Sequence, residues 1–192
     1  MELEAEALEH LVRDPVMERL IDRHGALDVR THDDGFARLV RSIVRQQVSM
    51  KSAEAIYGRL EDEFDVEPRA LASASEADLV DVGLSSAKAR YVKSAARAFA
   101  EGELSVEGLA ETDDDAAVEA LTDVRGVGPW TAKMYLIFVL GRDDVFPVED
   151  LGVRRAMESL YGLESAGEMR ERSRVWKPYR TAATHYLWRH VD

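Results

Sequence analysis

Apolar residues recur along most of the chain at the spacing of one face of an α-helix. The pattern is clearest between residues 36 and 48, where Phe36, Val40 and Ile43 begin a stripe that runs to Val48. Alternation of apolar and polar residues, which would favour a β-strand, occurs only in very short stretches. The sequence therefore predicts an all-α protein of about ten short helices. These helices are expected at residues 3–12, 15–23, 36–48, 49–64, 76–82, 86–100, 115–122, 129–140, 150–161 and 177–190.

Short turns, rather than linkers, separate the predicted helices. The turns are marked by Gly83, Gly102, the Gly126–Pro129 segment and Gly162, and no low-complexity stretch divides the chain. A chain of 192 residues is long enough to bury a substantial core, as one compact domain or as two closely joined lobes.

The composition excludes several classes of protein. Cys is absent, which excludes disulfides, thiolate catalysis, zinc–thiolate sites and an iron–sulfur cluster. No apolar run in the sequence approaches the roughly 18 residues of a membrane span. Residues 1–6 are acidic, where a secretory signal would be basic and then apolar. We therefore expect a cytoplasmic protein with no membrane partner.

The charge is strongly acidic and unevenly distributed. The formal net charge is −12, and only five of the 25 basic residues are Lys. A surface rich in Asp and Glu and poor in Lys is typical of halophilic proteins, because molar salt shortens the Debye length to about 3 Å and screens the repulsion. An acidic protein from a less saline cell is the alternative. Basic residues gather in segments 88–97 and 170–180, so one basic face on an acidic body is compatible with a nucleic-acid partner.

The segment Leu121–Lys133 is the most informative stretch. It predicts a helix end, a tight turn through Gly126 and Gly128, and a second helix that begins at Pro129, where the missing N–H of proline does no harm. The two glycines allow a close backbone approach and leave N–H groups at a helix N-terminus, which suits a phosphate without any charged side chain. A Gly-x-Gly-Pro turn alone is more typical of an ordinary joint between helices.

Three further blocks accompany this hairpin, and together they indicate a family. They are Ile43–Ser49, Phe146–Asp150, and Trp176–Arg180 continued by His185–Trp188. With these blocks the chain resembles the helix-hairpin-helix DNA glycosylases, in particular the 3-methyladenine DNA glycosylase II branch. The blocks follow the family order and cover approximately residues 36 to 190.

The resemblance implies an overall arrangement. We expect a single glycosylase domain over residues 1–192, folded as two helical lobes with the DNA cleft between them. Lobe one would comprise about residues 1–40 and 148–192, and lobe two about residues 41–147, including the hairpin at 121–133. The expected partner is damaged double-stranded DNA, and the expected state is a monomer.

Asp150 is the residue that the resemblance assigns to catalysis. The N-glycosidic bond of a purine breaks with oxocarbenium character at the sugar, so the site needs a fixed anion near C1′. A helix N-terminus at Asp150 would favour the ionised carboxylate. The alternative role is a plain N-cap worth about 1 kcal/mol. Glu149 is the nearest rival carboxylate, one residue out of register.

The extruded base requires a pocket that holds it by stacking. The resemblance places Trp130 and Trp188 in this pocket, where electron-rich rings would attract the cationic ring of an N3- or N7-alkylated purine. Core packing is the alternative for each Trp. Further candidates for the pocket are Gln47, Met134, Tyr135 and Tyr179. Gln47 is expected on the apolar stripe of helix 36–48, where its amide would contact either a base edge or a neighbouring helix.

The resemblance also implies a set of DNA contacts and a bound cation. Predicted DNA-binding residues are Gly126, Val127, Gly128, Trp130, Thr131 and Lys133 in the hairpin, with Ser86 or Leu84 filling the space that the flipped nucleotide leaves. The carbonyl oxygens of Thr122, Val124 and Val127 would hold a structural K⁺ or Na⁺, which bridges carbonyl dipoles and phosphate. No cofactor is expected for catalysis.

Trp130 bears on the reaction type. Family members that also cut the strand carry a Lys at this position, which forms a Schiff base with C1′. The sequence therefore predicts a monofunctional hydrolase of alkylated purines, without β-lyase activity, that acts first in base excision repair. The alternatives are a glycosylase with another lesion preference, such as deaminated bases, and a non-catalytic DNA-binding module.

Overall fold

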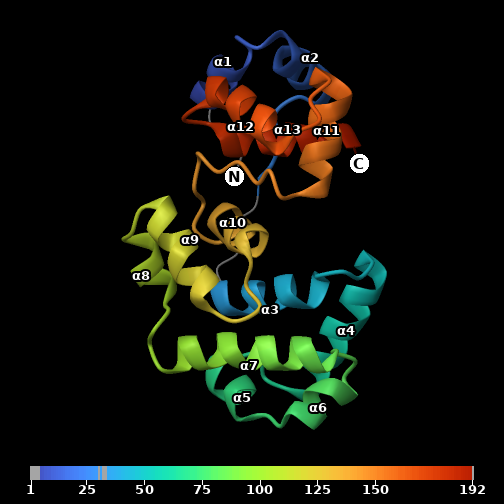
Figure 1. Cartoon of the computed structure of the whole chain (residues 1–192), viewed down its shortest axis with the longest axis vertical. Helices are drawn as coiled ribbons and strands as arrows, with labels where there is room; N and C mark the ends of the chain where they lie inside the picture. Colours follow the sequence, from blue (N-terminus) through green and yellow to red (C-terminus); the bar gives the residue numbers. More distant parts are fainter. Residues whose placement is uncertain (1–4, 30, 32–33, 192) are drawn as a thin grey trace. The chain divides into compact units, whose positions relative to one another are not determined.

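The computed structural model describes residues 5–29, 31 and 34–191, and their fold is helical (Figure 1). The described residues form thirteen α-helices and one short 3-10 helix, η1, and they contain no β-strand. The predicted all-α class is therefore confirmed. In the described part of the chain, none of the helices has the length and apolar character needed to cross a membrane.

The chain divides into two compact units. The first unit combines Met1–Thr31 with Leu136–Asp192, and the second is His32–Tyr135. One unit built from both ends of the chain agrees with the expectation, but the expected boundaries near residues 40 and 147 differ from the structural ones. The helix that starts at residue 35 belongs wholly to the second unit, and the loop 139–147 belongs to the first.

The second unit is organised around its longest helix, α7. Helices α3, α5 and α6 pack against α7, and α4 packs against α3. The buried side chains include Leu39, Ile43, Leu60 and Val92. The helices of this unit are α3 (Gly35–Arg45), α4 (Met50–Glu63), α5 (Pro68–Ser73), α6 (Glu76–Asp81), α7 (Ser86–Ala100), α8 (Val106–Ala110), α9 (Asp114–Asp123) and the greater part of α10 (Pro129–Phe138).

In the first unit, α13 lies at the centre. It packs against α11, α2 and α1 around a core that contains Met17, Val153, Met157 and Tyr186. The elements of this unit are α1 (Ala5–Leu11), α2 (Pro15–His24), α11 (Leu151–Tyr161), α12 (Ala166–Ser173), η1 (Arg174–Trp176) and α13 (Arg180–Val191).

One polar network inside this unit joins four elements. The carboxylate of Asp14, which caps α2, accepts hydrogen bonds from Tyr161 Oη at 2.8 Å, Trp176 Nε1 at 2.8 Å and Arg172 Nη2 at 2.5 Å. Burial alone would raise the pKa of Asp14, but the hydrogen bonds from Trp176, Val16 and Tyr161 and the charge of Arg172 outweigh burial, so its pKa lies below the usual value. The network ties α2, α11, α12 and η1 together.

The helix predicted over residues 36–48 ends earlier than expected. The structural helix α3 stops at Arg45, so Gln46 and Gln47 lie outside it. Gln47 has a φ of 56°, which non-glycine residues rarely adopt, and its side chain is exposed rather than on the apolar stripe. The placement of Gln47 on a buried helical face is therefore wrong.

Candidate active site and DNA-binding hairpin

Asp150 is the N-cap of α11, as the sequence predicted. Its Oδ1 accepts the backbone N–H of Val153 at 3.0 Å and the indole N–H of Trp188, which lies on α13, at 2.9 Å. The side chain is half-buried. Two donors from different helices converge on one carboxylate oxygen, so the Asp150 side chain is held in one orientation.

Aromatic rings hold Trp188 in position. The indole stacks on Phe138 with an interplanar angle of 13° and a centroid distance of 5.8 Å, and His185 meets it edge-on at 5.2 Å. Burial lowers the pKa of His185 to about 4, so its imidazole is neutral near pH 7. The sequence suggested Trp188 as a pocket wall; the structure gives it a second task, because it orients the Asp150 carboxylate.

Gly152 completes this arrangement. A Cβ at this position would lie 3.1 Å from Asp150 Oδ1 and 3.2 Å from Trp188 Cδ1. Both distances are tighter than ordinary van der Waals contact, so a side chain here would press on the carboxylate and the indole together. Gly152 was not among the residues predicted from the sequence, although a glycine two residues after Asp150 is a signal that could have identified it.

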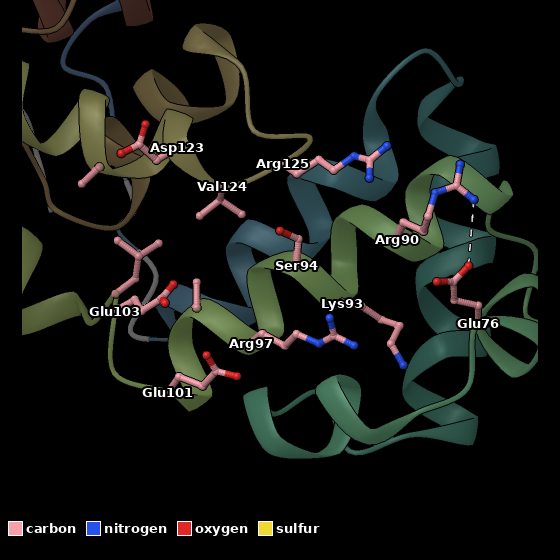
Figure 2. Close-up of a pocket in the computed structure, with 13 residues that line it drawn as sticks. Glu76, Arg90, Lys93, Ser94, Arg97, Glu101, Glu103, Asp123, Val124 and Arg125 are labelled. Carbon is pink, nitrogen blue, oxygen red and sulfur yellow. Dashed lines mark ion pairs between the residues drawn. The ribbon is translucent and has the colours of Figure 1, made fainter.

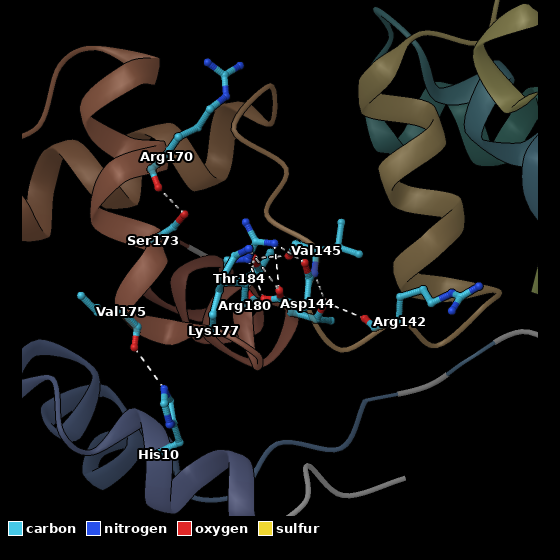
Figure 3. Close-up of polar contacts among 11 residues, drawn as sticks. His10, Arg142, Asp144, Val145, Arg170, Ser173, Val175, Lys177, Arg180 and Thr184 are labelled. Carbon is cyan, nitrogen blue, oxygen red and sulfur yellow. Dashed lines mark hydrogen bonds and ion pairs between the residues drawn. The ribbon is translucent and has the colours of Figure 1, made fainter. Parts of the chain in front are cut away.

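The loop before Asp150 is fastened to the start of α13 (Figure 3). Arg180 makes a bidentate pair with the Asp144 carboxylate, with N···O distances of 2.6 and 3.0 Å. Thr181 donates its N–H to the Asp143 carbonyl at 2.8 Å, and its hydroxyl accepts the N–H of Val145 at 3.0 Å. The loop that leads into Asp150 and the helix that carries Trp188 are therefore joined at several points.

The hairpin turn adopts the glycine-dependent geometry that the sequence predicted. Gly126 has a φ of 92°, and a Cβ there would fall 2.1 Å from Cγ of Tyr91 on α7, so only glycine fits. The N–H groups of Gly126, Gly128 and Thr131 have no acceptor among the described residues. The N–H of Val127 is used within the turn, where it donates to the Val124 carbonyl at 3.0 Å. Three main-chain donors at the start of α10 are thus available to an anion.

Gln46 braces this turn from the end of α3. Its Nε2 donates to the Gly126 carbonyl at 3.0 Å and to Thr131 Oγ1 at 3.2 Å. The Thr131 side chain is therefore buried and engaged inside the protein, and only its N–H fits the predicted DNA contact. The amide that matters to the hairpin is that of Gln46, not Gln47.

The other predicted residues fall into different environments. Met134 and Tyr135 are buried on α10, and the Tyr135 hydroxyl has no hydrogen-bond partner among the described residues. Burial raises the pKa of Tyr135. Trp130 and Lys133 are partly buried. Tyr179 packs edge-on against His10 of α1, with ring centroids 5.6 Å apart.

Leu84 does not suit the insertion role that was considered for it. Its side chain is only 3% exposed, because it packs in the core of the second unit. Ser86, the first residue of α7, is exposed, and so is Gln47. A residue that enters the DNA stack must be exposed, so of the two predicted candidates the burial pattern favours Ser86 over Leu84.

The carbonyl groups proposed for a monovalent cation are suitable in chemistry. Thr122 is the penultimate residue of α9, and Val124 and Val127 lie in the turn that follows it. Carbonyl oxygens at a helix C-terminus carry partial negative charge and are the hard ligands that K⁺ and Na⁺ prefer. Within the described residues no cluster of His, Asp or Glu side chains has the arrangement of a metal site.

Residues 40–180 match the HhH-GPD superfamily of base excision DNA repair proteins. The DNA-3-methyladenine glycosylase 1 of Schizosaccharomyces pombe is 32% identical over 163 residues, which cover 80% of this chain and 71% of that protein. The chain spans 58% of the length of a Bacillus subtilis relative that is 31% identical to it over 80% of this chain.

Two solved structures have the same fold. The DNA-3-methyladenine glycosidase of Bacillus halodurans has a TM-score of 0.86 and 32% identity, covering 98% of this chain and 89% of that chain. The 3-methyladenine DNA glycosylase of Schizosaccharomyces pombe, solved in complex with abasic DNA, has a TM-score of 0.85 and 29% identity and covers 96% of both chains.

Proposed function

Because the chain belongs to the HhH-GPD superfamily of base excision DNA repair proteins, we propose that it is a monofunctional DNA glycosylase for alkylated purines. Its substrates would be 3-methyladenine and 7-methylguanine in double-stranded DNA. The names of its relatives support this substrate class. The observation that carries the proposal is the Asp150 carboxylate, held by the Val153 N–H and the Trp188 indole at the start of α11.

The proposed reaction is hydrolysis of the N-glycosidic bond. Positive charge develops on the sugar as the base departs, and the oriented Asp150 carboxylate stabilises that charge. The electrons of the broken bond leave with the cationic base, which becomes neutral; the oxygen of water bonds to C1′, and the proton that the water loses passes to the solvent. The products are a free alkylated purine and an abasic site. Since the carboxylate is already fixed by its two donors, little reorganisation is needed in the transition state.

The base would be recognised by aromatic and hydroxyl groups. An alkylated purine carries positive charge, which the faces of Trp130 and Trp188 attract. The buried Tyr135 hydroxyl lacks a protein partner among the described residues, and such a group is costly unless a ligand satisfies it. We expect this hydroxyl to bond to the extruded base.

DNA would be anchored through the main chain of the hairpin. The N–H groups of Gly126, Gly128 and Thr131 can receive one phosphate, since they have no acceptor among the described residues. A K⁺ or Na⁺ held by the carbonyls of Thr122, Val124 and Val127 would add a positive charge beside that phosphate.

Base release from alkylated DNA tests the proposed function. Asp150→Asn should lower the single-turnover rate by at least about 100-fold, the scale of losing one preorganised electrostatic group, while affinity for lesion DNA changes little. Glu149→Gln is the matched control, because this neighbouring carboxylate is exposed and should leave the rate within a few-fold of wild type. Asp150→Asn with near-normal activity would remove Asp150 from the chemistry. Faster release of deaminated than of alkylated bases would overturn the substrate class.

The monofunctional reaction is a separate prediction. Trp130 occupies the hairpin position where a Schiff-base Lys would stand, and Lys133 is turned about 60° away from it around the helix. Borohydride should therefore trap no covalent adduct between protein and DNA, and the abasic strand should remain intact. A trapped adduct that disappears in Lys133→Ala would show instead that the protein is also a lyase.

A further inference from the structure

The second unit contains a cavity that the proposed chemistry does not use. Its volume is about 620 Å³, and it lies between α7, the end of α9 and the start of the hairpin turn. Figure 2 shows its two ends. Arg90 and its partner Glu76 lie at one end of the lining, Glu101, Glu103 and Asp123 lie at the other, and Ser94, Arg97 and Arg125 lie between them. The charged lining residues are Glu76, Arg90, Lys93, Arg97, Glu101, Glu103, Asp123 and Arg125.

The basic side chains differ in how far the protein already uses them. Lys93 donates to the Ala74 carbonyl at the end of α5, so its role is internal. Arg90 forms a long pair with Glu76, at 3.9 Å, in which both side chains are exposed. Arg97 and Arg125 are exposed and have neither an ion pair nor a side-chain hydrogen bond with any described residue. Two guanidinium groups are therefore free to bind an anion, and a third is held only weakly.

These arginines are contiguous with the DNA-binding hairpin. Arg125 directly precedes Gly126, and the Gly126 turn rests on the ring of Tyr91, which lies next to Arg90 on α7. The phosphate-binding turn and the arginines of α7 thus occupy one part of the same unit. The cavity lining holds four basic and four acidic side chains, so it lacks the acidic excess of the whole chain, whose net charge is −12.

We propose that Arg90, Arg97 and Arg125 form a second DNA contact, which binds backbone phosphates beyond the one received by the hairpin. Arg90 and Arg97 are two helical turns apart, about 10 Å along α7. That distance matches the axial rise of about three nucleotides of B-form DNA. Arginine suits the task because its planar guanidinium binds phosphate in bidentate fashion and stays charged.

The acidic side of the cavity defines where the contact ends. Glu101, Glu103 and Asp123 line the end away from Arg90, and they would repel phosphates that extended further. The proposed contact is therefore short, and it extends the stretch of DNA that the protein covers on one side of the lesion only. This inference rests on the proposed DNA-binding function, but it concerns residues outside the reacting centre.

The double variant Arg97→Gln/Arg125→Gln tests the second contact. Its affinity should be measured on a duplex with a stable abasic analogue, once with long flanks and once with both flanks shortened to a few base pairs. On the long duplex we expect about a 10-fold loss of affinity and a slope of log K against log[KCl] that is more positive by about two. On the short duplex the loss should largely vanish. Arg69→Gln, an exposed arginine of α5 outside the cavity, is the matched control and should behave as wild type.

Two results would overturn the proposal. One is a double variant with the same affinity and the same salt slope as Arg69→Gln on the long duplex. The other is a loss of equal size on both duplexes, which would place the arginines at the lesion rather than on its flank. Failure of the proposed function would look different: the wild-type protein would bind the duplex but would release no alkylated purine.

Discussion

At the scale of single residues, the carboxylate of Asp150 depends on a partner 38 residues further along the chain. A carboxylate at a helix N-terminus often acts only as a cap. Here the same oxygen that caps α11 also accepts the Trp188 indole, and Gly152 leaves room for both. Trp188 is in this sense a positioning residue, whatever its contact with the base.

Trp188→Phe should separate the two tasks of this side chain. Phenylalanine keeps a ring that can stack on Phe138 but removes the N–H donor to Asp150. Loss of a hydrogen bond to a charged group corresponds to roughly 1.5–3 kcal/mol, so we expect the single-turnover rate to fall by about 10- to 100-fold. If the indole acts through Asp150, the double variant with Asp150→Asn should be no slower than Asp150→Asn alone. Additive losses would contradict the positioning role.

At the scale of elements, the helices with long periodic patterns and the six-residue α6 were predicted from the sequence, but three other short helices were not. Helices α4, α7 and α11 coincide closely with their predicted ranges. Helices α5, α8 and α12 have six, five and eight residues, and the apolar pattern of these segments did not indicate a helix, so none was predicted there. The signal that these helices leave in the sequence is N-terminal capping, which for α12 is the capping box formed by Ser165 and Glu168.

Individual residues of the candidate site could be predicted from the sequence, but the contacts between them could not. The residue types and the spacing of Asp150 and the hairpin glycines mark them in the sequence, so they could be identified as site candidates without the structure. The partners of these residues are distant in sequence: Gln46 contacts Gly126 and Thr131, and Arg180 contacts Asp144. Periodicity says nothing about such pairs. The same limit placed Gln47 on a helix that ends two residues before it.

The Asp14 network should make the first unit sensitive to acid. The pKa of Asp14 is lower in the folded protein than its usual value, so the unfolded chain binds this proton more readily. The stabilisation is complete above the unfolded pKa, near 4, and it is lost as the pH falls through the folded value. Asp14→Asn should lower the free energy of unfolding by about 2 kcal/mol at pH 7 and should flatten its decline between pH 5 and pH 3. Urea unfolding at several pH values measures both effects.

A matched control for this experiment is Asp113→Asn, which removes the charge of the N-cap of α9 in the other unit but keeps an oxygen that can accept the Ala116 N–H. Its stability should decline with acid as steeply as that of wild type. An equally steep decline in Asp14→Asn would mean that other carboxylates dominate the acid response.

At the scale of the whole molecule, the charge opposes the proposed partner. A chain with a net charge of −12 is repelled by DNA, and the repulsion is long-ranged at low ionic strength. In the proposed binding mode the hairpin contributes main-chain N–H groups, whose hydrogen bonds to phosphate would lose little by screening. The cavity arginines add local attraction, which weakens as salt rises. The balance between the general repulsion and the local attractions sets the salt concentration at which the protein is expected to bind DNA.

We expect activity on alkylated duplex DNA to rise from about 0.1 M toward molar KCl, because screening removes the general repulsion and relieves the acidic clusters of the fold. An equal ionic strength of a bulky organic cation should be less effective, since it cannot enter the carbonyl site at Thr122, Val124 and Val127. Initial rates of base release, with circular dichroism to follow the fold, measure this. A steady loss of activity above about 0.1 M with the fold intact would contradict both the halophilic character and anchoring through the main chain.

The division of the chain also implies an order in which its two units fold during synthesis on the ribosome. The second unit is one continuous stretch, His32–Tyr135, whereas the first is built from both ends of the chain. Domains generally fold as units while synthesis proceeds, so the hairpin can form on a nascent chain while Asp150 still lacks its donor. The indole of Trp188 is added 38 residues after Asp150, and the loop at Asp144 waits for Arg180. A growing chain can therefore form the hairpin turn before the Asp150 carboxylate has its Trp188 donor, and that pair is complete only after α13 has been synthesised.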